Sequence, residues 1–134
     1  MAKIIDIEGI GPVYAEKLTA AGIATTEALL EKGATPKSRQ ELEEQTGISG
    51  KLLLEWINRA DLMRIKGVGE EYSDLLEAAG VDTVPELAQR NAANLHQQLV
   101  LINKEKKLVR QAPGFNAVQD WIAEAKTLPR IVNY

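Results

Sequence analysis

The stretch IEGIGPVY at positions 7–14 returns, with four identities, as IKGVGEEY at positions 65–72. The match continues in the same register through a set of Leu, Ala, Gly and Thr positions, among them Leu18 and Leu76, Gly22 and Gly80, and Thr25 and Thr83. Further along the chain the offset between the two copies becomes larger, so that Trp56 corresponds to Trp121. Self-similarity of this kind indicates two copies of one structural unit. The second copy is longer between its two matched blocks, and we place the insertion near positions 95–112.

Both copies show the apolar spacing of helices. Residues 12–21 and 70–79 each predict a helix that ends before a glycine, Gly22 or Gly80, at a position that favours left-handed backbone. Other helix ends follow from capping residues: N-caps at Thr35, Ser49 and either Asn91 or Asn94, a capping box of Thr83 with Glu86, a stop at Gly47 and a break at Pro113. We expect an all-α fold of two pseudo-symmetric units, residues 1–62 and 63–134, packed as one compact helical domain around a shared core, with Trp56 and Trp121 buried between the units.

Composition excludes several classes of protein. The chain has 134 residues, no Cys and one His, so thiol chemistry, disulfides and sites that need two imidazoles are absent. No apolar run approaches the ~18 residues of a membrane span, and the N-terminus lacks the pattern of a signal peptide. We therefore expect an intracellular, cytoplasmic protein without a membrane partner.

Charge is unevenly distributed along the chain. The net charge is −3, yet residues 65–86 carry one basic and six acidic residues, whereas residues 87–134 carry seven basic and three acidic ones. A basic face is typical of nucleic-acid-binding modules, and only the C-terminal third has this sign. Its candidates are Lys104, Lys106, Lys107 and Arg110, with Lys126 and Arg130 as further members; a solvated surface explains the same residues equally simply.

The repeated glycine pairs precede helices, where free backbone amides attract anions. With their flanking residues they resemble the helix-hairpin-helix family, whose pattern is apolar-x-Gly-apolar-Gly-x-x-x-Ala-x-x-Leu. The first copy matches with Gly9, Ile10, Gly11, Ala15 and Leu18, and the second with Gly67, Val68, Gly69, Ser73 and Leu76. Residues 21–30 also resemble the C-terminal domain of the bacterial RNA polymerase alpha subunit. Over nearly the whole chain, the sequence resembles an uncharacterised bacterial family built of two such units.

The resemblance implies sequence-independent binding of duplex DNA, with hairpin amides holding phosphates of the two strands. It assigns this role to Gly9, Ile10, Gly11, Gly67, Val68 and Gly69, and the basic residues Lys66, Lys104, Lys107 and Arg110 would add charge. Glu70 and Glu71 depart from the family pattern, because they occupy the space that a phosphate needs. The alternative is a protein-protein interaction scaffold that keeps the fold and has lost DNA binding.

No arrangement of residues predicts catalysis, so we expect a non-enzymatic module. His96 has no partner for a metal or a proton relay, and the Glu70, Asp74 and Glu77 face is more simply a solvated helix surface than a Mg²⁺ site. Trp56 and Trp121 lie in apolar stripes, which favours core packing over base stacking. We expect no cofactor; the resemblance leaves open a monovalent cation on the hairpin carbonyls.

Overall fold

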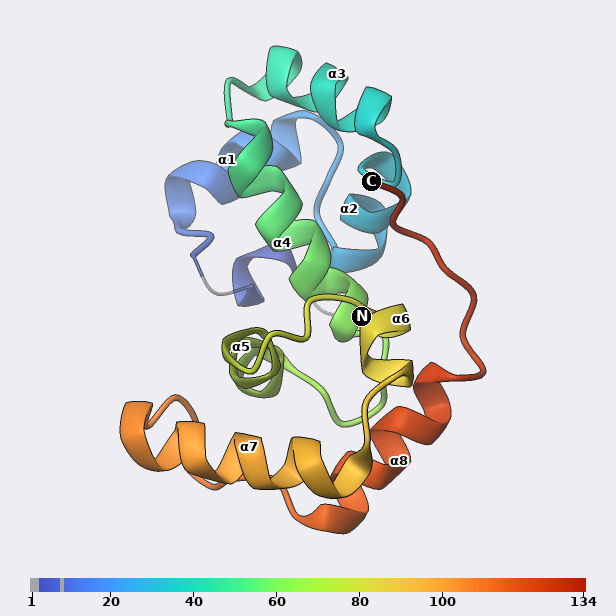
Figure 1. The fold of residues 1–134 in the computed structure, drawn as a ribbon. Helices are drawn as coiled ribbons and strands as arrows, with labels where there is room; N and C mark the ends of the chain where they lie inside the picture. The colour runs from blue at the N-terminus through green and yellow to red at the C-terminus, as the bar shows by residue number, and fades with distance from the viewer. Residues whose placement is uncertain (1–2, 8) are drawn as a thin grey trace. The chain divides into compact units, whose positions relative to one another are not determined.

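The computed structural model describes residues 3–7 and 9–134. Over these residues the chain forms eight α-helices and one short 3₁₀-helix, and its extended structure is limited to an isolated bridge between Lys3 and Thr25 (Figure 1). The prediction of an all-α fold is therefore confirmed. None of the helices in the described ranges is long and apolar enough to cross a membrane.

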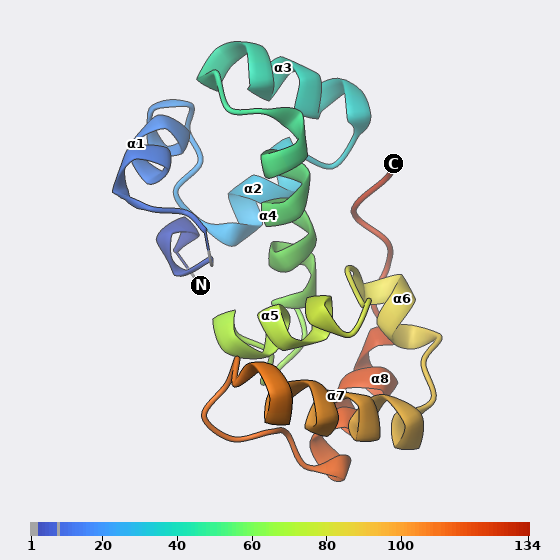
Figure 2. The ribbon, with the colours of Figure 1, turned by 60° about the vertical axis from the view of Figure 1, so that its left-hand side comes forward.

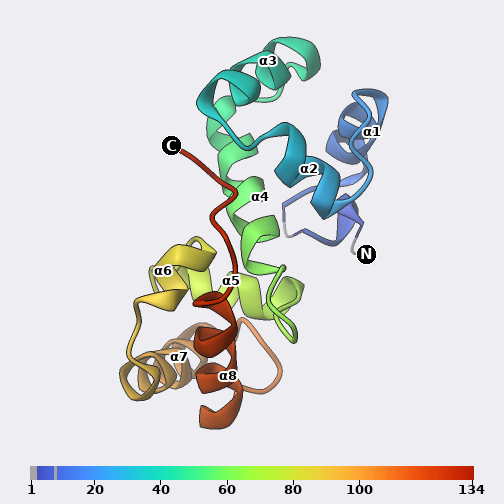
Figure 3. The same ribbon diagram turned by 90° about the vertical axis from the view of Figure 1, so that its right-hand side faces the viewer.

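The chain divides into two compact units. The first comprises Met1–Asp61 together with Ile131–Tyr134, and the second comprises Leu62–Arg130. We expected the second unit to continue to residue 134, but the last four residues return to the first unit. There the Asn133 amide donates to the Ala34 carbonyl at 2.8 Å, and Arg39 Nη2 donates to the Asn133 carbonyl at 2.6 Å. Figure 3 shows this last segment, in red, running from α8 to the end of the chain.

The first unit begins with η1 (Ile4–Asp6), followed by α1 (Pro12–Ala20), α2 (Thr26–Lys32), α3 (Pro36–Thr46) and α4 (Gly50–Leu62). Three of the expected caps are present: Thr35 accepts from the Ser38 amide, Ser49 accepts from the Leu52 amide, and Gly47 ends α3 in left-handed conformation with φ 75°. Gly33 at the end of α2 packs against Ile57, so that α2 lies beside α4 (Figure 2).

The second unit contains α5 (Glu70–Ala78), α6 (Val84–Ala88), α7 (Ala92–Lys106) and α8 (Phe115–Ala125). Here α8 packs against α6 and α7, and α7 packs against α5. The sequence repeat pairs the first residues of α1, α2 and α4 with three positions in the second copy. The helices α5, α6 and α8 begin at those three positions. The extra length of this copy lies in α7, which has 15 residues where α3 has 11, and in the connection 107–114 that follows it.

Two capping predictions in the second unit have different outcomes. Of the two candidates for the start of α7, Asn91 is the N-cap, and its side chain accepts from the Asn94 amide at 3.0 Å. The capping box at Thr83 is wrong, because the Thr83 side chain accepts no helix amide. Its hydroxyl instead donates to the Glu86 carboxylate at 3.3 Å, which leaves that oxygen turned away from the amides of α6.

Each unit buries its own apolar residues. In the second unit they form one cluster drawn from residues 62–128, which includes Trp121. In the first unit the largest fully buried side chains are those of Trp56, Ile7, Leu18, Ile23, Leu29, Ile48, Leu53 and Ile57. The burial predicted for both tryptophans is confirmed, since Trp56 is 2% and Trp121 4% exposed.

One charged side chain is buried in the first unit by the returning end of the chain. Arg39 is 8% exposed and donates to the carbonyls of Gly33 and Asn133. Burial lowers the pKa of the Arg39 guanidinium from its ordinary value, and the nearby Tyr134 opposes this in part. The two carbonyls supply the hydrogen bonds that a buried cation needs.

Candidate functional site

The first glycine pair forms a sharp turn directly before α1. Gly9 has φ 94°, a left-handed value that an L side chain rarely adopts, and the Ile10 amide donates to the Ile7 carbonyl at 3.1 Å. The Ile10 side chain is buried and fixes the turn to the core. Gly11 is the N-cap of α1, and a Cβ built on it meets nothing within 4 Å. Glu8, the second residue of the repeated sequence, lies outside the described residues.

The second glycine pair has the same local geometry. Gly67 has φ 88°, the Val68 amide donates to the Ile65 carbonyl at 3.0 Å, and the Val68 side chain is buried. Gly69 is the N-cap of α5, and the space around its Cβ position is also open. The repeated sequence therefore corresponds to a repeated turn, which we call the first hairpin (residues 7–11) and the second hairpin (residues 65–69).

A tryptophan lies against each hairpin. A Cβ on Gly9 would come within 3.3 Å of Trp56 Nε1, and a Cβ on Gly67 would come within the same distance of Trp121 Nε1. Each indole also packs at 5.2 Å, centroid to centroid, against the tyrosine in the first turn of the following helix, Tyr14 or Tyr72. Each tryptophan thus supports the hairpin of its own unit. Only the pairing of Trp56 with Trp121 in the sequence repeat pointed to this shared role.

The hairpin residues differ in what they offer to a ligand. The amides of Ile10 and Val68 donate within the turns, and both side chains are buried in the core. In α1 the first intrahelical donor is the Ala15 amide, and Pro12 has no N–H. Helix geometry therefore leaves the amides of Gly11, Val13 and Tyr14 without an intrahelical acceptor.

The helices that follow the two hairpins differ in the charge of their first turn. The first turn of α1 contains no acidic residue, whereas that of α5 contains Glu70 and Glu71. Lys66 is exposed, but its amide donates to Glu124 Oε1 at 3.0 Å, which brings a third carboxylate to the second hairpin. The first turn of α1 therefore has no carboxylate, whereas Glu70, Glu71 and Glu124 lie at the second hairpin.

Lys107 and Arg110 lie beyond the end of α7 and do not share a helix face. The helix ends at Lys106, and Lys107 adopts a left-handed conformation, φ 53°, the one such non-glycine residue in the described part of the chain. Its amide donates to the Asn103 carbonyl, and the Asn103 side chain accepts from the Val109 amide. Lys104, in the last turn of α7, and Arg110, in the connection, are both exposed.

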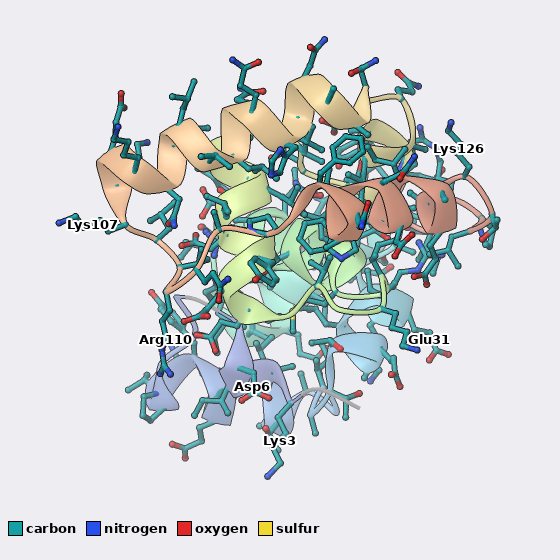
Figure 4. The ribbon with its side chains drawn as sticks, turned by 90° about the horizontal axis from the view of Figure 1, so that it is seen from below. Lys3, Asp6, Glu31, Lys107, Arg110 and Lys126 are labelled. Atoms are coloured by element: carbon teal, nitrogen blue, oxygen red, sulfur yellow. The ribbon has the colours of Figure 1, made fainter. Side chains whose placement is uncertain are left out.

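This connection lies beside the second hairpin's helix, while Lys126 lies elsewhere. The Tyr72 hydroxyl in α5 donates to the Gln111 carbonyl at 3.2 Å, which ties the connection to the first turn of that helix. Figure 4 shows Lys107 and Arg110 at the end of the second unit where α7 finishes, and Lys126 at the opposite end. Lys126 therefore does not join the cluster of Lys104, Lys107 and Arg110.

The remaining chemical candidates have ordinary surroundings. His96 is half-buried in α7, with its ring edge-on to Phe115 at 5.9 Å. Within residues 3–7 and 9–134, no three His, Asp or Glu side chains are grouped so that they could hold a metal ion. The two hairpins differ from these candidates in their backbone geometry and in the charge of the helices that follow them.

Comparison with known proteins places the chain in one family. No solved structure matches it. A family model does match, over residues 8–128, which include both tryptophans, the connection after α7 and the glycine pairs of both hairpins. The chain therefore belongs to the family described as Domain of unknown function (DUF4332).

Proposed function

We propose that the chain is a tandem helix-hairpin-helix module without catalytic activity, which binds the phosphate backbone of duplex DNA without reading its sequence. One observation carries this proposal: the same exposed turn, with φ near +90° at its first glycine and an open N-cap glycine at its second, precedes a helix in both units. The repetition of that geometry at matched positions of the two sequence copies also supports pseudo-symmetric units.

In the first unit the ligand is a phosphate on the open side of Gly11. The absence of a side chain there lets a phosphate oxygen approach the amides of Gly11, Val13 and Tyr14, and the helix dipole adds to the attraction. No carboxylate in the first turn of α1 opposes it. Such contacts address the DNA backbone alone, so that binding is indifferent to sequence.

In the second unit the three carboxylates reduce what the hairpin contributes. The attraction there comes from Lys104, Lys107 and Arg110, which the bond from Tyr72 to Gln111 keeps near α5. Because the whole chain has a net charge of −3, binding is weak and is lost rapidly as salt is added.

The test is a fluorescence-anisotropy titration of two labelled duplexes of unrelated sequence at ~20 mM and ~200 mM salt. We expect equal affinities for the two duplexes and a steep loss at the higher salt. Glu70→Lys with Glu71→Lys strengthens binding, whereas changing Lys104, Lys107 and Arg110 together to Ala weakens it.

The control for general charge is the double variant Glu43→Lys with Glu44→Lys, which makes the same change in net charge on exposed positions of α3. An equal gain in both double variants would show that the second hairpin is not part of the site. The absence of binding by the wild-type protein at ~20 mM salt would overturn the proposal.

That last outcome would favour the second candidate, a protein-interaction scaffold. The observation behind it is Val13, which is 66% exposed in the first turn of α1. A partner with an apolar surface would cover Val13, and Val13→Lys would then abolish its binding.

A further inference from the structure

The second unit has a hollow of about 480 Å³ on the side of α8 opposite the hairpin-facing Trp121. It is lined by the start of α7 and by one face of α8: Arg90, Asn91, Ala92, Gln119, Ile122, Ala123 and Lys126. Two of these residues are cationic and none is acidic. In a chain with more acidic than basic residues, a concave surface without a carboxylate is a distinctive feature.

The Arg90 guanidinium is held in place at the wall of this hollow. Its Nη1 donates to the Ala79 carbonyl at 3.3 Å, and its Nη2 donates to Oε1 of Gln98, whose own side-chain amide donates to the same carbonyl. A guanidinium has five N–H groups in a rigid fork. These bonds therefore fix its orientation and leave further N–H groups for a ligand.

The internal repeat offers a comparison for this arrangement. In the first unit Lys32 stands at the position of Arg90, and its Nζ donates to the Ala21 carbonyl at 3.1 Å. A lysine is thus sufficient to cap the preceding helix. The second unit has the residue with the larger set of donors, at the edge of a hollow to which α8 adds a second cation, Lys126.

We propose that this hollow binds a phosphate monoester, with the phosphate between Arg90 and Lys126. A phosphate monoester carries a charge of about −1.5 to −2 at neutral pH and three acceptor oxygens, which match two cations from different elements. The volume exceeds what the phosphate needs, and Ile122 and Ala123 provide an apolar surface for the body of the ligand. The site is separate from the hairpins and does not depend on DNA binding through them.

The probe is adenosine 5′-monophosphate, titrated into ¹⁵N-labelled protein and followed by amide chemical shifts, with adenosine as the unphosphorylated comparison. We expect saturable shifts at Ala92, Gln119 and Ala123 with the monophosphate and none with adenosine. Lys126→Gln weakens binding about tenfold, the value of one charge-assisted hydrogen bond. Arg90→Lys also weakens it while preserving the fold, because Lys32 already fills the equivalent role in the first unit.

Lys51→Gln is the matched control, since it removes one positive charge from an exposed position of α4 in the first unit. A short oligonucleotide with and without a 5′-phosphate distinguishes the source of the ligand: preference for the phosphorylated strand over the mononucleotide indicates a nucleic-acid end, and the reverse indicates a small metabolite. Equal binding of adenosine, an equal effect of Lys51→Gln and Lys126→Gln, or no saturable shift would overturn the proposal.

Discussion

The second hairpin offers a sharp test of the structure, because its two glycines have different roles. In Gly67→Ala the new methyl group must adopt φ 88° and lies 3.3 Å from Trp121 Nε1. The left-handed conformation costs about 1–2 kcal/mol for an L residue, and the close contact with the indole adds to this. Alanine also lowers the conformational entropy of the unfolded chain, which raises the free energy of unfolding by about 0.4–1 kcal/mol. We expect a net loss of about 1–2 kcal/mol in the free energy of unfolding, measured by urea denaturation.

The control is the neighbouring Gly69→Ala, at the other end of the same turn. Gly69 has φ −105° and an empty space at its Cβ position, so an alanine fits without strain. The weaker N-cap propensity of alanine offsets its entropic advantage, and we expect a change within about 0.5 kcal/mol. If both variants lost the same stability, or if Gly67→Ala were neutral, the assignment of the left-handed turn and its contact with Trp121 would be wrong. Gly9→Ala and Gly11→Ala should repeat the contrast in the first unit.

Two further predictions concern single side chains. Trp56→Ala removes a buried aromatic that supports the first hairpin and should cost about 3–5 kcal/mol in thermal denaturation; a loss below about 1 kcal/mol would mean that Tyr14 and the hairpin do not depend on it. Lys107→Gly relieves the left-handed lysine at the end of α7 and should raise stability by about 1 kcal/mol, while the removal of its charge weakens any DNA binding; a destabilised variant would contradict the backbone conformation at that position.

Sequence reasoning was successful where a feature depends on neighbouring residues. Gly-x-Gly before a helical pattern predicts a turn because only glycine adopts positive φ readily, and both hairpins have that backbone. The left-handed Gly22 and Gly80 after α1 and α5 followed for the same reason. The end of α7 at Lys107 was not predictable, since lysine has no preference for the left-handed conformation.

Features that join distant parts of the chain could not be predicted from the sequence. The contact between Gly9 and Trp56 depends on how α4 packs over the first hairpin, and an apolar stripe identifies a buried face without its partner. The hollow beside Arg90 depends on the spacing of α7 and α8, and its residues form no motif in the sequence. Proximity of this kind is a property of the tertiary structure. In the sequence, only the repeat indicated that the two tryptophans have the same role.

The return of Ile131–Tyr134 makes the first unit discontinuous in sequence, with the whole of the second unit inserted into it. During synthesis the residues that complete the first unit leave the ribosome after the whole of the second unit. The hydrogen bonds from Asn133 to Ala34, from Arg39 to Asn133, and from Tyr134 to Asn58 must therefore wait for all of Leu62–Arg130 to be made. The second unit is continuous, and all of its residues are synthesised before the first unit has its last four. The second unit can therefore be completed before the first, which is the reverse of their order in the sequence.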